Sequence, residues 1–351
     1  MQTLLAIFAL AIMMIIHELG HFLPARYFNM RVTKFSIGFG PTIVHLQPKG
    51  SPTVYQVSII PFLAYVQIAG MNPFEENDPK DTGLYCNASL WARVVTIFGG
   101  PLANYLTASV FIFFGLLLGG RSELDTSSMR VTVIPKSQAG EDAPAKIAGF
   151  ADGDRILSIN GKPIQNWDDL RSETSRHPGE KMDVAVERAG SKDPLHLFPV
   201  PLSVGEEKGK MLLAPPEVSR PIGAKEAMVF AVTDPPKVVA GLIIGLGRII
   251  TGKEKPQLSG PVGMVKETKK VVQRGLGRTL QFIGALSAYL GAFNLLPFPA
   301  LDGGRLMFLG IELASRRKPD AKLEAKVHAI GLLMLLTLIT LVTYGDIFKP
   351  R

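Results

Sequence analysis

Residues 94–120 read VVTIFGGPLANYLTASVFIFFGLLLGG, a run of 27 residues without a charged side chain between Arg93 and Arg121. As a helix, such a run is long enough to cross the roughly 30 Å hydrocarbon core of a bilayer. Uncharged runs of similar character occupy residues 279–301 and 327–345. The three runs predict membrane-spanning helices and indicate a polytopic α-helical membrane protein.

A fourth apolar segment opens the chain. Residues 4–16 are apolar, and after His17-Glu18-Leu19-Gly20-His21 the apolar character resumes at residues 22–24. Residues 1–10 contain neither Lys nor Arg, whereas a cleavable signal peptide begins with a positively charged region. We therefore expect a retained helix of about 22 residues. Four transmembrane helices then place both termini on the same side.

Composition supports a membrane protein. Apolar residues make up 47% of the chain and charged residues only 19%, against roughly 25% charged in soluble proteins. The net charge of +8 is spread beside the apolar runs, which argues against nucleic acid as a partner. The single cysteine, Cys86, cannot form an intramolecular disulfide or a thiolate zinc cage. Any metal must therefore be held by histidine and carboxylate.

Basic residues predict the orientation, because Lys and Arg are enriched in cytosolic loops. Three of them, Arg26, Arg31 and Lys34, follow the first span, and five lie within residues 316–326 before the last. Both loops are expected in the cytosol. Residues 122–222, with 16 acidic and 13 basic side chains, then lie outside. Seven basic residues at 253–278 disagree, although long translocated loops follow the rule less strictly.

The segment between the first two spans predicts a β-hairpin. Residues 33–46 and 53–69 read as strands around the turn-forming residues 48–52. These strands are unusually apolar for a hairpin in water. We expect a membrane-associated β-hairpin that dips into the bilayer beside protein, because only there could its backbone groups be satisfied.

Residues 130–215 predict a small inserted α+β domain. Asn160-Gly161 is a hairpin signal after a strand at 154–159, and Asn166 can cap a helix that starts at Trp167. The run from Ala145 to Asp154, followed by Ile156, Ile159, Asn160 and Gly161, resembles bacterial PDZ domains, which bind extended peptides by strand addition. Further strands are expected at Arg130–Pro135, Met182–Arg188 and Leu195–Val200.

The expected organisation has four parts. From residue 222 to 248 the apolar sequence is interrupted by Asp234-Pro235-Pro236-Lys237, which favours helices on the membrane surface over a span. The parts are residues 1–121 with two spans and the β region, 122–222 with the extracytoplasmic PDZ domain (core 130–215), 223–278 as an amphipathic surface segment, and 279–351 with the last two spans.

A zinc site is predicted within the first span. His17 and His21 are four residues apart, so on a helix their imidazoles share one face and can hold one metal ion. Glu18 lies one position further round, where it can reach an attacking water without being a ligand. Ionisable groups inside an apolar helix each cost roughly 2–3 kcal/mol near the middle of a membrane. Helix packing alone therefore explains them poorly.

A third protein ligand is needed, with one position left open for water. Asp302 closes the apolar run that begins at Asn294, and Pro297 and Pro299 break the helix there. Irregular backbone survives in a membrane only where it is buried in protein or lines a cavity. These observations favour Asp302 as the third ligand.

Four motifs in this order, His17–His21, Gly100-Pro101-Leu102-Ala103-Asn104, Ser259-Gly260-Pro261-Val262-Gly263 and Asn294–Gly304, resemble the site-2 protease family of intramembrane zinc metalloproteases, peptidase family M50. The chain is similar to the RseP-like type, although that type carries two PDZ domains and this chain has room for one.

The resemblance implies a multi-pass protein of the bacterial cytoplasmic membrane with one Zn²⁺ per chain and an active site near the cytosolic side. Its substrates would be single-span membrane proteins, such as anti-sigma factors or signal-peptide remnants, after a first extracytoplasmic cut. Asn294 and residues 54–66 would engage the unwound substrate. Asn104 would either stabilise the oxyanion or only pack the second span. The PDZ domain would exclude uncut substrates or hold a new C-terminus, and we favour exclusion.

Two other classes of function were weighed. A proteolytically inactive, membrane-anchored PDZ adaptor would have lost part of its ligand set, which is intact here. A zinc transporter would carry polar ligands in several spans and His-rich loops, yet the chain has only 6 histidines. The four histidines outside the motif, His45, His177, His196 and His328, are expected to be structural or surface residues.

Overall fold

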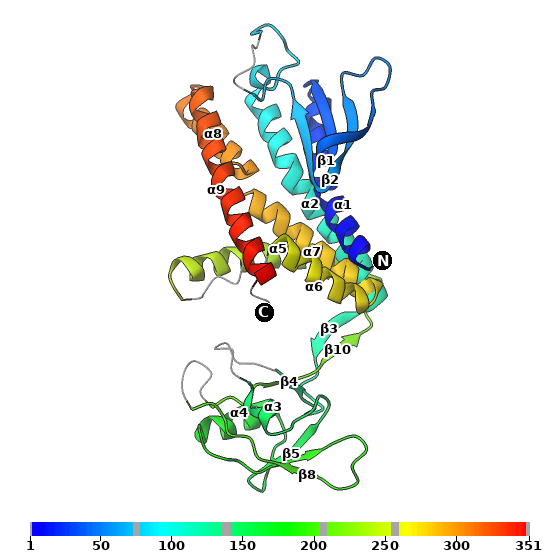
Figure 1. Cartoon of the computed structure of the whole chain (residues 1–351), viewed down its shortest axis with the longest axis vertical. Helices are drawn as coiled ribbons and strands as arrows, with labels where there is room; N and C mark the ends of the chain where they lie inside the picture. The colour runs from blue at the N-terminus through cyan, green and yellow to red at the C-terminus, as the bar shows by residue number, and fades with distance from the viewer. Residues whose placement is uncertain (1, 73–77, 135–141, 204–208, 254–259, 349–351) are drawn as a thin grey trace. The chain divides into compact units, whose positions relative to one another are not determined.

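A computed structural model describes residues 2–72, 78–134, 142–203, 209–253 and 260–348 (Figure 1). The chain divides into two compact units, the first made of residues 1–120 and 221–351 and the second of residues 121–220. The inserted unit thus spans nearly the range expected for the extracytoplasmic domain. Two residues of the sequence motifs and expected strands, Ser259 and Pro135, lie outside the described residues.

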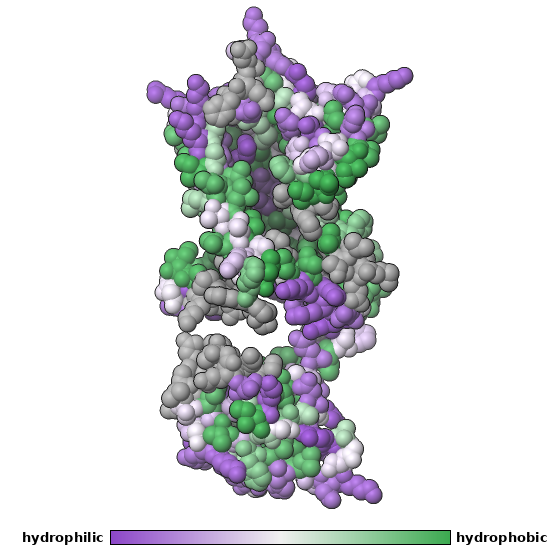
Figure 2. Space-filling view, in the orientation of Figure 1, coloured by the Kyte–Doolittle hydropathy of each residue, from purple (hydrophilic) through white to green (hydrophobic). Residues whose placement is uncertain are grey.

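The first unit is built mainly of helices. Four of them, among the residues described, are long and apolar enough to cross a membrane, namely α1, α2, α5 and α9. Figure 2 shows hydrophobic residues over the middle of this unit and hydrophilic residues at the end where α8 connects to α9. The helices are α1 (Gln2–Tyr27), α2 (Leu90–Gly119), α5 (Ala224–Ile250), α6 (Pro261–Gln273), α7 (Leu276–Asn294), α8 (Asp302–Ser315) and α9 (Ala321–Phe348).

The number of candidate spans agrees with the sequence, but the third one differs. The expected span at 279–301 is helical only as far as Asn294, because Pro297 and Pro299 cannot continue a helix. The apolar segment at 222–248 instead forms one continuous helix, α5, with both of its prolines inside. In Figure 1, α5 runs across the direction of α9.

Helices α1 and α2 touch backbone to backbone. A Cβ atom added at Gly20 would lie 2.2 Å from the carbonyl oxygen of Gly99, and one added at Gly99 would lie 2.1 Å from that of Gly20. A second contact of this kind joins α2 to α7, where a Cβ at Gly277 would lie 2.3 Å from the nitrogen of Gly119. Small residues at such contacts are typical of helices packed in membranes. They fix α2 between α1 and α7.

The β-hairpin forms as expected, from β1 (Val32–Leu46) paired antiparallel with β2 (Val54–Ile68). The end next to α1 is buried, and Val32 and Ile68 belong to a core shared with α1 and α2. The far end exposes large apolar side chains, which form an apolar surface. They are Phe39, Ile43, Val44, Leu46, Val57, Ile59 and Ile60. A short 3₁₀ helix, η1 (Tyr85–Asn87), precedes α2.

The second unit is a small α+β fold. Its largest sheet has the order β6-β5-β7-β8, and two strand pairs, β3 with β10 and β4 with β9, complete it. The elements are β3 (Arg121–Leu124), β4 (Thr132–Val133), α3 (Pro144–Ile147), β5 (Arg155–Ile159), β6 (Lys162–Pro163), α4 (Trp167–Arg176), β7 (Val184–Glu187), β8 (Leu195–Leu197), β9 (Leu213–Ala214) and β10 (Glu217–Arg220).

Local sequence signals explain these elements. Asn160 and Gly161 have φ of 49° and 77°, as the two-residue turn between β5 and β6 requires. The Asn166 side chain accepts a hydrogen bond of 2.8 Å from the Asp169 N–H and caps α4. The core is apolar and fully enclosed, with Val131, Ile156, Ile159, Met182, Val184 and Val186 each at most 1% exposed.

One buried ion pair ties the second unit together. Asp154 is 1% exposed and accepts two hydrogen bonds of 2.7 Å from Arg188 and one of 2.9 Å from the Ala151 N–H. Burial acts to raise the pKa of the Asp154 carboxyl, but the Arg188 guanidinium and the backbone hydrogen bond outweigh burial and hold this pKa below its usual value. Asp154 is therefore charged at neutral pH.

Candidate metal centre

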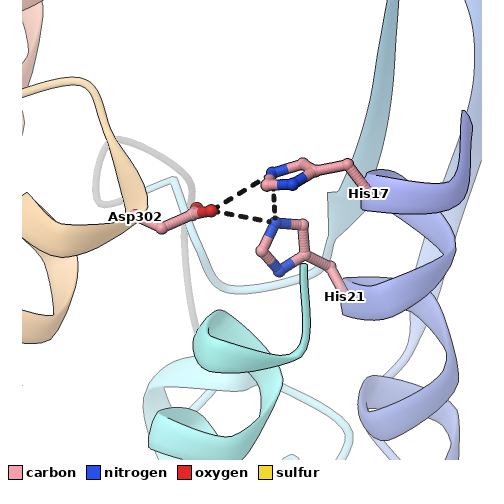
Figure 3. Close-up of side chains that lie close together, drawn as sticks. All are labelled: His17, His21 and Asp302. Atoms are coloured by element: carbon pink, nitrogen blue, oxygen red, sulfur yellow. Dashed lines mark hydrogen bonds and ion pairs between the residues drawn. The ribbon is translucent and has the colours of Figure 1, made fainter. Parts of the chain in front are cut away.

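Three predicted ligands meet in the first unit, two from α1 and one from the start of α8 (Figure 3). The Nε2 atoms of His17 and His21 lie 3.2 Å and 3.3 Å from Oδ2 of Asp302. The two Nε2 atoms are 3.2 Å apart. The two histidines are buried and Asp302 is nearly so. Residues 17, 21 and 302 thus present three ligand atoms to one point.

This triangle fits a zinc ion. Ligands held about 2.0–2.1 Å from tetrahedral zinc are separated by about 3.3 Å, close to all three distances here. The Nδ1 atom of His21 lies 2.9 Å from the carbonyl oxygen of Thr96, which can only accept a hydrogen bond. The neutral ring is therefore protonated on Nδ1, and its Nε2 lone pair faces the carboxylate of Asp302. A metal cation between the two would make that arrangement favourable.

The broken segment after α7 carries Asp302 to this point. A Cβ at Gly303 would lie 2.2 Å from the Leu296 carbonyl oxygen, and one at Gly304 would lie 2.4 Å from that of Phe298. The sequence Leu-Asp-Gly-Gly is thus needed for α8 to start against the backbone of residues 295–301. Glycine is required at both positions because any side chain would push Asp302 away.

Helix α9 supports the same segment from the other side. The Ala300 N–H donates a hydrogen bond of 2.9 Å to Nδ1 of His328, and Ala300 has a φ of 74°. A Cβ at Gly331 would lie 2.3 Å from Cβ of Pro299. His328 is therefore a structural residue, as expected, and it stabilises the turn that precedes Asp302.

Glu18 stands beside the ligands without joining them. The Val66 N–H of β2 lies close to its carboxylate. The β-hairpin therefore reaches the metal centre through its second strand, at the residue that the sequence predicts as general base.

The two predicted substrate-binding asparagines lie differently with respect to the ligand triangle. The Asn294 amide donates a 3.0 Å hydrogen bond to the Leu290 carbonyl oxygen and so turns back along its own helix. Asn104 is 0% exposed, and its amide nitrogen lies 3.0 Å from Nδ1 of His17. Asn104 is thus brought to the back of a metal ligand.

Sequence reasoning missed an ion pair that joins α2 to α8. Arg93 donates two hydrogen bonds to Glu312, of 2.9 Å and 2.5 Å, and both side chains are largely buried. Arg93 borders an apolar run, and this position suggested only a flanking charge. Its partner is 219 residues away in sequence, so no local signal could have identified it. The pair holds α8, and with it Asp302, against α2.

A cavity of about 570 Å³ lies between β2, η1 and the helices α8 and α9. Val66, whose N–H lies close to Glu18, is part of its wall. The cavity therefore borders the strand that reaches the metal centre. Charged and polar side chains line it, among them Gln67, Arg93, Arg305, Glu312, Glu324 and His328.

Apolar helices bring together two histidines, an aspartate and a neighbouring glutamate, the side chains that a metallopeptidase inside a membrane requires. Comparison with known families agrees, because the family described as peptidase family M50 matches residues 5–338. The chain belongs to this family and is an intramembrane zinc metalloprotease.

Its relatives match over nearly their full length. A protein of Fusobacterium nucleatum is 32% identical, and the match covers 99% of each chain. The regulator of sigma-W protease RasP of Bacillus subtilis is 30% identical over 94% of each chain. The zinc metalloprotease RasP of Geobacillus kaustophilus is 29% identical over 95% of this chain and 94% of its own.

Proposed function

We propose that His17, His21 and Asp302 hold one Zn²⁺ and that Glu18 is the general base for hydrolysis of a peptide bond within the bilayer. The observation that carries this proposal is the triangle of ligand atoms, with sides of 3.2–3.3 Å, next to Glu18. Bound zinc supplies the Lewis acidity that activates water for attack on a carbonyl.

The residues around the ligands suit the remaining chemistry. Glu18 accepts the proton of the attacking water and passes it to the leaving amine. The Val66 N–H lies close to the Glu18 carboxylate and would help to orient it. The cavity beside β2 lies on the side on which α8 connects to α9, and water would approach the centre from that side.

The substrate must be presented as an extended strand, because a helix hides its carbonyl groups in internal hydrogen bonds. Addition of the substrate beside β2, at residues 54–66, would satisfy the opened backbone. Asn294 would help to bind the extended substrate once its amide no longer donates to the Leu290 carbonyl oxygen. This arrangement selects single-span segments that unwind readily.

Membrane-tethered regulators are the substrate class that we favour, together with signal-peptide remnants. The name of the Bacillus subtilis relative, a regulator of sigma-W protease, supports this choice. Residues 121–220 would be a single PDZ-type domain outside the cytoplasmic membrane, restricting access until a first cut has removed the outer part of the substrate. An inactive adaptor is disfavoured because the ligand set and Glu18 are complete.

Substitution of the base and of the ligands tests the division of roles. Glu18→Gln should abolish cleavage of a purified transmembrane substrate while zinc stays near one per chain, because no ligand is lost. His17→Ala and Asp302→Asn should lower zinc content and cleavage together. Substantial turnover by Glu18→Gln would show that another group is the base.

Cysteine labelling from outside the cell tests the orientation. In a Cys86→Ser background, a cysteine at Ser191 in the inserted unit should react with an impermeant reagent, whereas one at Ser315 should react only after lysis. The basic loop that follows Ser315 is the physical reason. Labelling in the opposite pattern would reverse the proposed orientation.

A further inference from the structure

Each ligand histidine has a second ring nitrogen, and α2 contacts both. Thr96 accepts from Nδ1 of His21 through its carbonyl oxygen at 2.9 Å, and Asn104 lies 3.0 Å from Nδ1 of His17. Residues 96 and 104 are eight apart, about two helical turns, and so lie on one face of α2. One helix face therefore orients both imidazoles.

The two contacts differ in what they can do. The Thr96 carbonyl can only accept, so it directs the His21 proton to Nδ1. The Asn104 amide presents its nitrogen to His17 and leaves its Oδ1 atom buried with no hydrogen-bond partner among the residues that the structure describes. A donated N–H at this point would direct the His17 proton to Nε2, the atom that faces Asp302.

A half-turn of the amide gives Oδ1 a donor and places the His17 proton on the nitrogen that faces away from Asp302. It exchanges oxygen and nitrogen with almost no change in shape. Oδ1 of Asn104 would then accept from a protonated Nδ1 of His17, as Thr96 does for His21. The lone pair of His17 Nε2 would be free for a metal ion.

We propose that Asn104 is a positioning residue for the zinc site, acting as the hydrogen-bond acceptor that fixes the tautomer and ring plane of His17. The inference rests on the proposed function of His17 as a ligand. Asn104 is 0% exposed, which favours this role over direct contact with an oxyanion.

The surroundings hold Asn104 in place for this role. Its own carbonyl oxygen accepts a hydrogen bond of 2.9 Å from the Ser287 hydroxyl of α7. A Cβ atom at Gly291 would lie 3.2 Å from Cβ of Asn104, so α7 leaves the side chain little room. Metal-binding histidines depend on such partners, whose loss typically weakens metal affinity 10–100-fold.

Zinc affinity of the purified full-length protein in detergent tests the proposal, with Asn104→Leu and Asn104→Asp as the main variants. Competition with a fluorescent chelator gives the dissociation constant for zinc alone. Asn104→Leu should bind zinc about 10–100-fold more weakly. Asn104→Asp should bind within about threefold of the wild type, because a carboxylate can only accept from Nδ1.

A matched control removes another buried amide between the same two helices. Gln281 of α7 donates to the carbonyl oxygens of Gly115 and Gly120, at 2.9 Å each, far along α2 from residue 104. Gln281→Leu should leave zinc affinity unchanged. The absorption spectrum of bound Co²⁺ gives a second readout, and Asn104→Leu should alter it while Asn104→Asp and Gln281→Leu should not.

The outcomes separate the possibilities. If Asn104 had only a structural role, a buried charge at this position would lower zinc affinity as much as Asn104→Leu does. A tenfold loss of zinc affinity in Asn104→Asp would therefore overturn the proposal. Wild-type affinity in a folded Asn104→Leu variant would also overturn it. If Asn104→Leu does not fold, Asn104→Asp alone decides. Failure of the wild type to bind zinc would instead refute the proposed function.

Discussion

Gly100 faces the second ligand histidine from α2, and its substitution by alanine should damage the metal centre selectively. A Cβ atom at position 100 would lie 2.3 Å from Nε2 of His21 and 2.4 Å from its Cε1 atom. Ordinary van der Waals contact begins at 3.4 Å. The imidazole of His21 would therefore have to move by about 1 Å.

This movement is large for a metal ligand. Ligand distances in zinc sites hold within about 0.2 Å, and a misplacement of about 1 Å at a reacting centre can cost about 100-fold. The hydrogen bond from His21 to Thr96 also opposes rotation of the ring. We expect Gly100→Ala to weaken zinc binding about 100-fold, which corresponds to about 2.7 kcal/mol.

Chelator competition on the purified protein measures this loss, and cleavage of a transmembrane peptide at saturating zinc shows how much activity returns. Gly310→Ala is the matched control, because no atom lies within 4 Å of a Cβ there and alanine is the better helix former by up to about 1 kcal/mol. If Gly100→Ala bound zinc as tightly as the wild type, the close contact between α2 and His21 would not exist in the working protein.

Two further substitutions test the ion pairs. The pKa of Asp154 is lower in the folded than in the unfolded state, so its stabilising effect should be full above about pH 4 and lost as pH falls through the folded pKa. Asp154→Asn should remove this pH dependence and cost about 2 kcal/mol of unfolding free energy at pH 7. Hydrogen exchange of residues 121–220 in the full chain measures both effects, and a pH profile unchanged by the substitution would refute the prediction. Arg93→Ala leaves Glu312 buried without its partner and should destabilise the first unit by about 3 kcal/mol, which lowers the midpoint of thermal unfolding. The double variant Arg93→Met/Glu312→Leu should recover most of this loss. Equal midpoints for the single and the double variant would argue against a stabilising Arg93–Glu312 ion pair.

Local patterns predicted much of this protein. The spacing of His17 and His21, the turn at Asn160-Gly161 and the cap at Asn166 depend on neighbours in sequence, and the structure has each as expected. The sequence favoured surface helices at 222–248, whereas the structure has one continuous helix, α5, of spanning length. Its first half packs against α2 and α7, a contact that its own sequence does not reveal.

Partnerships between distant residues were beyond sequence reasoning. The contact of Asn104 with His17 joins residues 87 apart, and that of Ala300 with His328 depends on the path taken by a broken segment. The sequence around Ala300 or His328 contains no pattern that would identify the other residue as its partner. Asp302 could be predicted because the prolines and glycines around it indicate an irregular backbone. Within a membrane, such backbone occurs only where it is buried in protein or lines a cavity.

The split of the metal centre between α1 and α8 has a consequence for biosynthesis. The two histidines leave the ribosome about 280 residues before Asp302. At roughly 5–20 residues per second, the nascent chain lacks its third ligand for roughly 15–60 s. Proteolytic competence therefore begins only when the C-terminal quarter has been inserted.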